Sequence, residues 1–92
     1  MSDCVVYETS LGAKPFTCEG EELAVDMRWV FEPVARHAAG EEMIAVIEGA
    51  AVVTCDGEVH KLVKGQGVLI PAGADRSWSF DTPALLYRVS LK

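Results

Sequence analysis

The chain has 92 residues, of which half are apolar and 24% are charged, and this composition is typical of a globular protein rather than a disordered one. A chain of this length builds one compact core, so we expect a single domain over residues 1–92. Fourteen acidic residues outnumber eight basic ones and give a net charge of −6. That balance argues against binding to nucleic acid, whose phosphates require a basic face, and against binding to an anionic membrane surface.

The first predicted element of the core is a strand that follows a peripheral segment. Residues 1–20 are expected to form an N-terminal arm or an edge strand, and a frayed tail is the alternative. From Leu23 to Phe31 every odd-numbered residue is apolar, while Asp26 and Arg28 occupy even positions. This period of two indicates a strand with one buried face, and it predicts that Trp29 and Phe31 point inward.

The segment Glu42–Glu48 is apolar at both odd and even positions, which predicts a strand covered on both faces. A second sheet covers one face, and a partner subunit is expected to cover the other, so we predict a homodimer. The segments Ala50–Cys55 and Glu58–Lys64 flank Asp56 and Gly57, a pair that strongly indicates a hairpin turn.

Three further strands are predicted over Val68–Pro71, Arg76–Phe80 and Leu85–Leu91. No window of the sequence keeps the apolar spacing of a long helix. About eight short strands joined by tight turns therefore predict an all-β sandwich or barrel over residues 23–91.

The cysteines and the N-terminal residues indicate the cellular compartment in which the protein is expected. Cys4, Cys18 and Cys55 make an odd number without a CxxC or Cys/His metal spacing, which favours reduced thiols in a cytoplasmic protein, with one disulfide as the alternative. The N-terminus has no basic stretch followed by an apolar segment, so no secretory signal is expected.

Two spaced motifs flank the predicted hairpin. The first has the spacing H-x4-E-x6-G, and the second has the spacing G-x5-P-x-G. The residues that carry them are His37, Glu42 and Gly49 in the first motif, and Gly65, Pro71 and Gly73 in the second. Gly49 and Gly73 suit turns that need a positive φ, and Pro71 presets a turn.

With these two motifs the chain resembles the cupin superfamily over Trp29 to Tyr87. The resemblance implies a small double-stranded β-helix, the jelly-roll barrel of cupins. The chain is also similar to the small cupins of the ureidoglycine and ethanolamine-utilisation groups, which place a tryptophan before the first motif and another after the second, as Trp29 and Trp78 stand here.

The resemblance also implies a set of four metal-binding positions, of which this chain keeps two. A metal-binding cupin supplies three histidines and one glutamate, a set that suits Fe, Mn, Ni, Zn or Cu. Here the positions are occupied by Ala35, His37, Glu42 and Arg76, and Phe80 replaces the asparagine of the second motif. A guanidinium cannot ligate a metal, but an inward Arg76 would pair with Glu42. We therefore favour no metal cofactor, and a divalent transition metal held by His37, Glu42 and a third ligand is the alternative.

These positions and the strand parities predict a cavity for a small molecule inside the barrel. Its predicted ligand-binding residues are apolar or aromatic with a few convergent polar groups, namely Trp29, His37, Glu42, Ile44, Arg76, Trp78 and Phe80. Arg76 and His37 would hold an anionic or hydroxylated ligand, and the aromatic rings would pack against its apolar part.

Other interpretations remain open at this point. Arg76 follows Asp75 and could pair with it at the surface, His37 could lie on an exposed loop, and His60 is expected at an exposed strand position. The principal hypothesis is a metal-free cupin that binds a small anionic or polar molecule. The alternatives are a metal-dependent isomerase, decarboxylase or dioxygenase, a metal-free acid–base enzyme that uses His37 and Glu42, and a structural or sensory dimer whose cavity its own side chains fill. Catalytic residues are not assigned.

Overall fold

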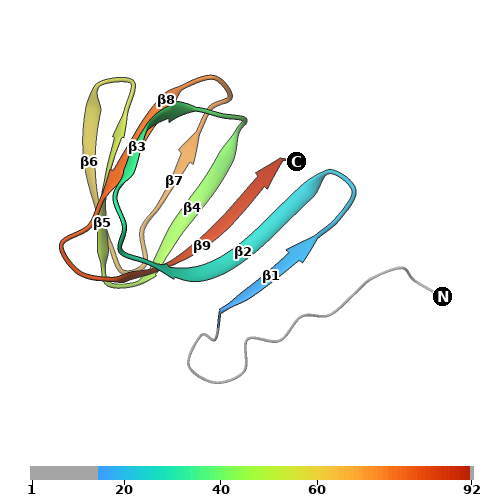
Figure 1. Ribbon diagram of the computed structural model, residues 1–92, viewed down its shortest axis with the longest axis horizontal. Helices are drawn as coiled ribbons and strands as arrows, with labels where there is room; N and C mark the ends of the chain where they lie inside the picture. The colour runs from blue at the N-terminus through green and yellow to red at the C-terminus, as the bar shows by residue number, and fades with distance from the viewer. Residues whose placement is uncertain (1–14, 92) are drawn as a thin grey trace.

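The computed structural model describes residues 15–91, and this part of the chain folds into β-strands without a helix (Figure 1). The strands are β1 (Phe16–Glu19), β2 (Leu23–Val30), β3 (Val34–Ala38), β4 (Glu42–Glu48), β5 (Ala50–Cys55), β6 (Glu58–Val63), β7 (Gly67–Ile70), β8 (Asp75–Ser79) and β9 (Ala84–Leu91). The predicted all-β jelly-roll fold is confirmed.

Most of these strands have the bounds that the sequence predicts to within a residue or two, and β4 and β5 match it at both ends. β1 pairs antiparallel with β2, so the edge-strand interpretation holds for Phe16–Glu19, whereas residues 1–14 lie outside the described part. The sequence analysis did not anticipate β3, because Val34–Ala38 does not alternate between apolar and polar residues. β3 pairs with β8 through a register that shifts between Val34 and His37.

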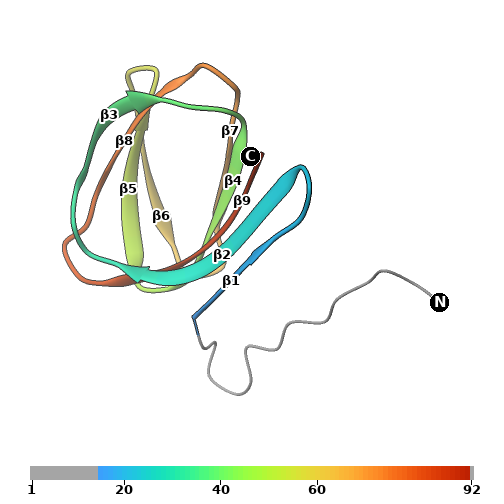
Figure 2. The same ribbon diagram turned by 45° about the vertical axis from the view of Figure 1, so that its right-hand side comes forward.

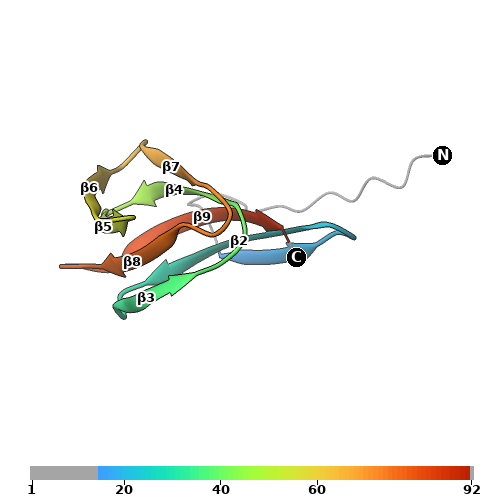
Figure 3. The same ribbon diagram turned by 90° about the horizontal axis from the view of Figure 1, so that it is seen from above.

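The strands form two antiparallel sheets that face each other (Figures 2 and 3). The five-stranded sheet has the order β1-β2-β9-β4-β7, and the four-stranded sheet has the order β3-β8-β5-β6. Strands that are distant in the sequence are therefore neighbours in the sheet. For example, β9 lies between β2 and β4. The core between the sheets is apolar and includes Ile44, Val46, Ala51, Val53, Leu62, Ile70, Ala74, Trp78, Ala84 and Leu86.

The predicted turns are present. Asp56 and Gly57 adopt φ values of 48° and 85°, and two successive positive φ angles are those of the type I′ turn that joins hairpin strands. Gly49 and Gly73 of the two motifs have φ values of 83° and 81°, as expected for turns that require glycine.

The backbone around Gly49 leaves less room for a side chain than the backbone around Gly73. A Cβ at Gly49 would lie 2.7 Å from the carbonyl oxygen of Pro83, whereas a Cβ at Gly73 would meet nothing within 4 Å. Both substitutions to alanine are penalised for the positive φ, by about 1–2 kcal/mol. We expect Gly49→Ala to cost a further 1–3 kcal/mol, roughly, because the backbone must move to relieve the clash. Urea denaturation of the two variants measures the difference, and equal destabilisation would contradict the close approach.

One prediction about the barrel interior is wrong. Trp29 and Phe31 are 53% and 52% exposed, so neither points into the core. On β2 the even-numbered residues face the interior, where Asp26 pairs in register with Arg88 of β9. The interior of this sheet is partly polar and its outer face is apolar, which inverts the usual interpretation of an alternating strand.

The two cysteines in the described part of the chain are free thiols, and His60 is at an exposed strand position, as the sequence predicts. Cys18 and Cys55 are free, and Cys4 lies outside the described residues. His60 is half exposed, and its Nε2 lies 3.5 Å from Glu58.

The part of the chain that the structure describes contains no helix that is long and apolar enough to span a membrane.

Candidate ligand-binding cavity

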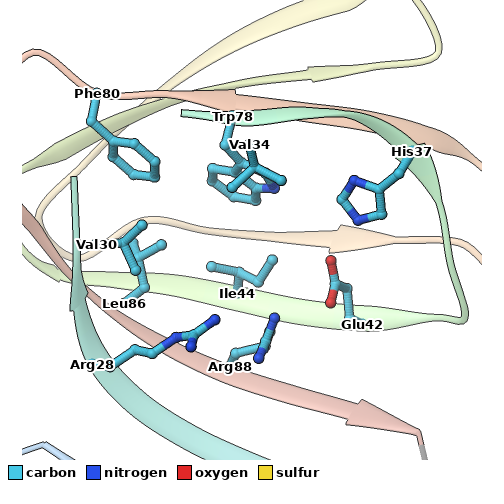
Figure 4. Close-up of a pocket in the computed structure, with 10 residues that line it drawn as sticks. All are labelled: Arg28, Val30, Val34, His37, Glu42, Ile44, Trp78, Phe80, Leu86 and Arg88. Atoms are coloured by element: carbon cyan, nitrogen blue, oxygen red, sulfur yellow. The ribbon is translucent and has the colours of Figure 1, made fainter. Parts of the chain in front are cut away.

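A cavity of about 150 Å³ lies between the two sheets at one end of the barrel (Figure 4). Its walls are formed by Arg28, Val30, Val34, His37, Glu42, Ile44, Trp78, Phe80, Leu86 and Arg88. Five of the predicted site residues are in this group: His37, Glu42, Ile44, Trp78 and Phe80. The structure places Trp29 on the outer face and Arg76 behind the wall.

One wall of the cavity is aromatic and apolar. Trp78 comes from β8 and Phe80 follows that strand, and their rings lie nearly parallel, with 8° between the planes and 6.3 Å between the centroids. Trp78 is only 6% exposed. The two rings provide a flat surface against which a planar apolar group can pack.

The opposite wall carries two arginines that the sequence analysis did not single out. Figure 4 shows Arg28 of β2 and Arg88 of β9 side by side, across the cavity from Trp78 and Phe80. Nη2 of Arg88 donates a hydrogen bond of 2.8 Å to Oδ2 of Asp26, and Nε of Arg28 lies 4.0 Å from the same oxygen. Asp26 therefore orients Arg88 while leaving other guanidinium donors available.

The sequence contains a charge pattern from which the position of these two arginines could have been predicted. Asp26 and Arg28 share one face of β2, and Arg88 shares the corresponding face of β9, where it lies opposite Asp26 in register. Opposite charges at facing positions of adjacent strands stabilise each other. β2 ends at Val30 and β9 begins at Ala84, so the pairing of these two distant strands had to be known before that signal could be used.

His37 is an exposed residue of β3 that lies at the rim of the cavity wall. Its Nδ1 lies 3.0 Å from the carbonyl oxygen of Ala35. Because a carbonyl only accepts, Nδ1 carries the hydrogen, and a neutral ring leaves Nε2 as an acceptor. The irregular register between Val34 and His37 turns the ring toward Glu42 (Figure 4).

Arg76 is the one fully buried charged residue of the described chain, with 0% exposure. Nη1 lies 3.1 Å from Oε1 of Glu42, which is the inward pairing that the sequence analysis considered. The other contacts of its guanidinium, all within 3.2 Å, are to backbone carbonyls of Ala39, Gly40, Pro71 and Ala74.

This arrangement makes Arg76 a positioning residue. Its contacts join the loop between β3 and β4 to the loop between β7 and β8, and they hold Glu42 at the cavity wall. All of its donors are engaged within the protein, so none is directed at the cavity. A buried guanidinium satisfied in this way avoids the large cost of an unpaired buried charge.

The surface alternative for Arg76 is not what the structure shows. The carboxylate of Asp75 is paired instead with Arg36, whose Nε donates a hydrogen bond of 2.9 Å and whose Nη2 also contacts the same oxygen. This hydrogen bond, with the charge of Asp75, raises the pKa of Arg36 above its ordinary value. Asp75 therefore has a partner on the outside, and Arg76 is free to turn inward.

The residues present do not supply the four-ligand metal set that the resemblance implies. His37 and Glu42 are ligand-type groups on the cavity wall, but Glu42 is already in an ion pair with Arg76. Within residues 15–91 the structure gathers no group of three or more His, Cys, Asp or Glu side chains. We therefore derive no chemistry through a metal from this arrangement.

The two facing sheets of the jelly roll define the class of protein as a small β-barrel. The cupin domain family matches residues 19–89. The chain belongs to this family. No curated protein matches the sequence.

Solved structures show the same fold. A conserved protein of unknown function from Streptococcus pyogenes is 19% identical, with a TM-score of 0.75 over 100% of this chain and 90% of that one. A cupin superfamily protein from Desulfitobacterium hafniense is 16% identical, with a TM-score of 0.76 over 84% of this chain and 74% of that one. The finer resemblance to the ureidoglycine and ethanolamine-utilisation groups stays a prediction.

A third structural neighbour is a salicylate 1,2-dioxygenase from Pseudaminobacter salicylatoxidans. It is 29% identical, with a TM-score of 0.68 over 75% of this chain. The match covers only 21% of the dioxygenase, so it concerns one part of a much longer protein.

Proposed function

We propose that the protein binds a small organic acid with a planar apolar body in its barrel cavity, without a metal. The observation that carries this proposal is the arrangement of Arg28 and Arg88 across one cavity from Trp78 and Phe80. A carboxylate suits the fork of guanidinium donors, and a ring suits the aromatic wall. The ligand contact that the sequence analysis gave to Arg76 is thereby assigned to Arg28 and Arg88.

The charges around the cavity favour a monoanion. The cavity wall and the residues directly behind it carry three arginines, Arg28, Arg76 and Arg88, and two carboxylates, those of Asp26 and Glu42. These three guanidinium groups and two carboxylates leave one positive charge in excess, although the whole chain carries a net charge of −6. A ligand with one carboxylate would neutralise that excess inside a partly apolar site.

The size of the cavity limits the ligand. A cavity of about 150 Å³ is comparable to an apolar cavity of about 150 Å³ that holds benzene. A benzoate-sized acid therefore fits better than a sugar or a nucleotide. The neighbouring dioxygenase is named for salicylate, a hydroxylated aromatic carboxylate, and this supports the same ligand class without assigning its reaction to this chain.

Thermal denaturation with matched small molecules tests the proposal. We expect benzoate and salicylate to raise the Tm by several degrees at about ten times their Kd, which corresponds to about 1.4 kcal/mol. Benzamide has the same shape without the charge, and acetate has the charge without the ring, so both are expected to stabilise much less. Equal stabilisation by benzamide and benzoate, or none by any aromatic acid, would contradict the proposal.

A metal-dependent enzyme is the second candidate, because both His37 and Glu42 lie on the cavity wall. Elemental mass spectrometry of the same protein distinguishes the two candidates. Metal bound at near one equivalent would move the assignment to this candidate and would require a third ligand.

A further inference from the structure

The cavity has a polar end that the proposed contacts to a carboxylate leave unused. Figure 4 shows Glu42 and His37 at this end with their side chains directed toward each other, whereas Val30 and Phe80 stand at the opposite, apolar end. Arg76 holds the polar end together, since it is the register partner of His37 and forms an ion pair with Glu42. A ligand that fills the cavity therefore meets polar atoms of both residues at one end only.

Glu42 presents one oxygen atom to this end. Its Oε1 lies 3.1 Å from Nη1 of Arg76, and within residues 15–91 its Oε2 has no hydrogen-bond partner. Because every fully buried polar side-chain atom of the described residues has a partner, Oε2 is open to the cavity rather than sealed within the protein. An ionised carboxylate accepts hydrogen bonds and donates none. The polar end therefore offers an acceptor, for which a ligand can supply the donor.

Glu42 lies beside the two arginines on the floor of the cavity. Ile44 is the register partner of Arg88, and Glu42 comes two residues before Ile44 on the same face of β4. Diagonal neighbours of this kind have Cα atoms about 7–8 Å apart, a span that one small ligand can bridge. Arg28 lies on the other side of Arg88, because it follows Asp26, the register partner of Arg88, by two residues. A carboxylate held by both arginines therefore has Glu42 to one side.

We propose, building on the function proposed above, that the cavity selects aromatic acids whose ring carries a hydroxyl group at the meta position, and that this hydroxyl donates a hydrogen bond to Oε2 of Glu42. With the carboxylate held by Arg28 and Arg88, one meta position of the ring turns toward the side on which Glu42 lies. A hydrogen bond to an ionised acceptor is roughly twice as strong as one between neutral groups. Nε2 of His37, an acceptor when the ring is neutral, lies at the same end.

Other substituents fit this arrangement less well. A hydroxyl group has one hydrogen to donate, and in salicylate, the ortho isomer, the neighbouring carboxylate of the same molecule accepts it. The para position points away from the carboxylate and toward Trp78 and Phe80 on the opposite wall. Those side chains offer no strong acceptor, so a para hydroxyl is penalised for its desolvation. An ammonium group at the meta position would restore the positive excess that the carboxylate neutralises.

Isothermal titration calorimetry of the full chain with four acids tests this selection. We expect meta-hydroxybenzoate to bind about 10-fold more tightly than benzoate, because its hydrogen bond is charge-assisted. The analogue meta-methoxybenzoate has the same oxygen without the hydrogen, and its lone pairs face those of Glu42, so it is expected to bind no more tightly than benzoate. The isomer para-hydroxybenzoate is expected to bind at least about 5-fold more weakly than benzoate.

The variant Glu42→Gln replaces the acceptor by a donor with little change in shape. The amide oxygen takes the place of Oε1, because the guanidinium of Arg76 has only donors, and the amide nitrogen then faces the cavity. The Kd of meta-methoxybenzoate divided by that of meta-hydroxybenzoate is expected to fall from about 10 in the wild type to about 1–2 in the variant. Since each ratio is measured within one protein, the lost charge affects both ligands alike.

Glu58→Gln is the matched control, because it makes the same chemical change in a β6 side chain that is 79% exposed. Its ratio is expected to equal that of the wild type. Binding of benzoate without a gain from the meta hydroxyl, or an unchanged ratio in Glu42→Gln, would overturn the selection and leave the proposed function standing. Failure of all four acids to bind would overturn both. Should circular dichroism show Glu42→Gln to be unfolded, the four acids with the wild-type protein decide the matter.

Discussion

Replacement of Arg76 by methionine is expected to lower the free energy of unfolding by about 3–5 kcal/mol, because it breaks a buried charge pair by removing one partner. Methionine retains much of the volume but leaves Glu42 and four backbone carbonyls without their common donor. In a domain of this size each 1 kcal/mol shifts the Tm by about 4–8 °C. Urea denaturation followed by circular dichroism measures the loss, and the variant is expected to be largely unfolded at 37 °C.

Arg36→Met provides the control for this experiment. It removes the same side chain and the same charge, but the Arg36 side chain is 78% exposed and pairs with Asp75 at the surface. Exposed ion pairs contribute little to stability, so its unfolding midpoint is expected to stay near that of the wild type. If Arg76→Met unfolds at the same urea concentration as Arg36→Met, Arg76 does not hold the two loops together.

The largest effect on binding is expected from Arg88→Met. Arg88 provides charge-assisted hydrogen bonds to the proposed carboxylate, and losing such bonds is expected to weaken benzoate binding by about 10- to 100-fold. The side chain is 36% exposed, and Arg28 remains close to Asp26, so a smaller effect on stability is expected. Isothermal titration calorimetry of the variant against benzoate gives the change in Kd.

Arg36→Met again serves as the control, because it changes the net charge by the same amount far from the cavity. Unchanged affinity in Arg36→Met, together with weakened affinity in Arg88→Met, would show that the effect is local rather than a change in overall charge. A Kd that rises equally in both variants, or in neither, would rule out Arg88 as the carboxylate contact.

The strands and turns of this fold could be predicted because their signals are local. Asp56 and Gly57 are sufficient to define a hairpin, and both adopt the positive φ values that such a turn needs. The bounds of β4 and β5 follow from the length of their apolar runs and from the glycine between them. β3 could not be predicted in this way, since its pairing with β8 is irregular and its sequence lacks a period.

The direction of β2 could not be predicted because alternation alone does not say which face is inside. Period two shows that Trp29 and Arg28 lie on opposite faces, but the choice of face depends on what each side meets. Arg28 lines a cavity, while Trp29 lies on the outer face of the same strand and is half exposed. On β2 the apolar odd-numbered residues face outward and the charged Asp26 and Arg28 face inward, which reverses the assignment without changing the alternating pattern.

The candidate site was predicted where motif spacing fixes it and missed where distant strands create it. His37 and Glu42 follow from the first cupin motif, and both line the cavity. The inward direction of Arg76 was one of the options considered, but its use of backbone carbonyls depends on loops whose shape the sequence does not show. Arg88 became a site residue only through its register with Asp26.

The most direct test of carboxylate binding in the cavity uses the two tryptophans, one inside and one outside. Trp78 is 6% exposed and lines the cavity, whereas Trp29 is 53% exposed on the outer face of β2. In ¹⁵N NMR spectra of the wild-type protein titrated with benzoate, we predict that the indole signal of Trp78 and the Nε–H signal of Arg88 shift with one common Kd, while the indole signal of Trp29 stays in place. No shift at Trp78 and Arg88, or a saturating shift confined to Trp29, would contradict the proposed site.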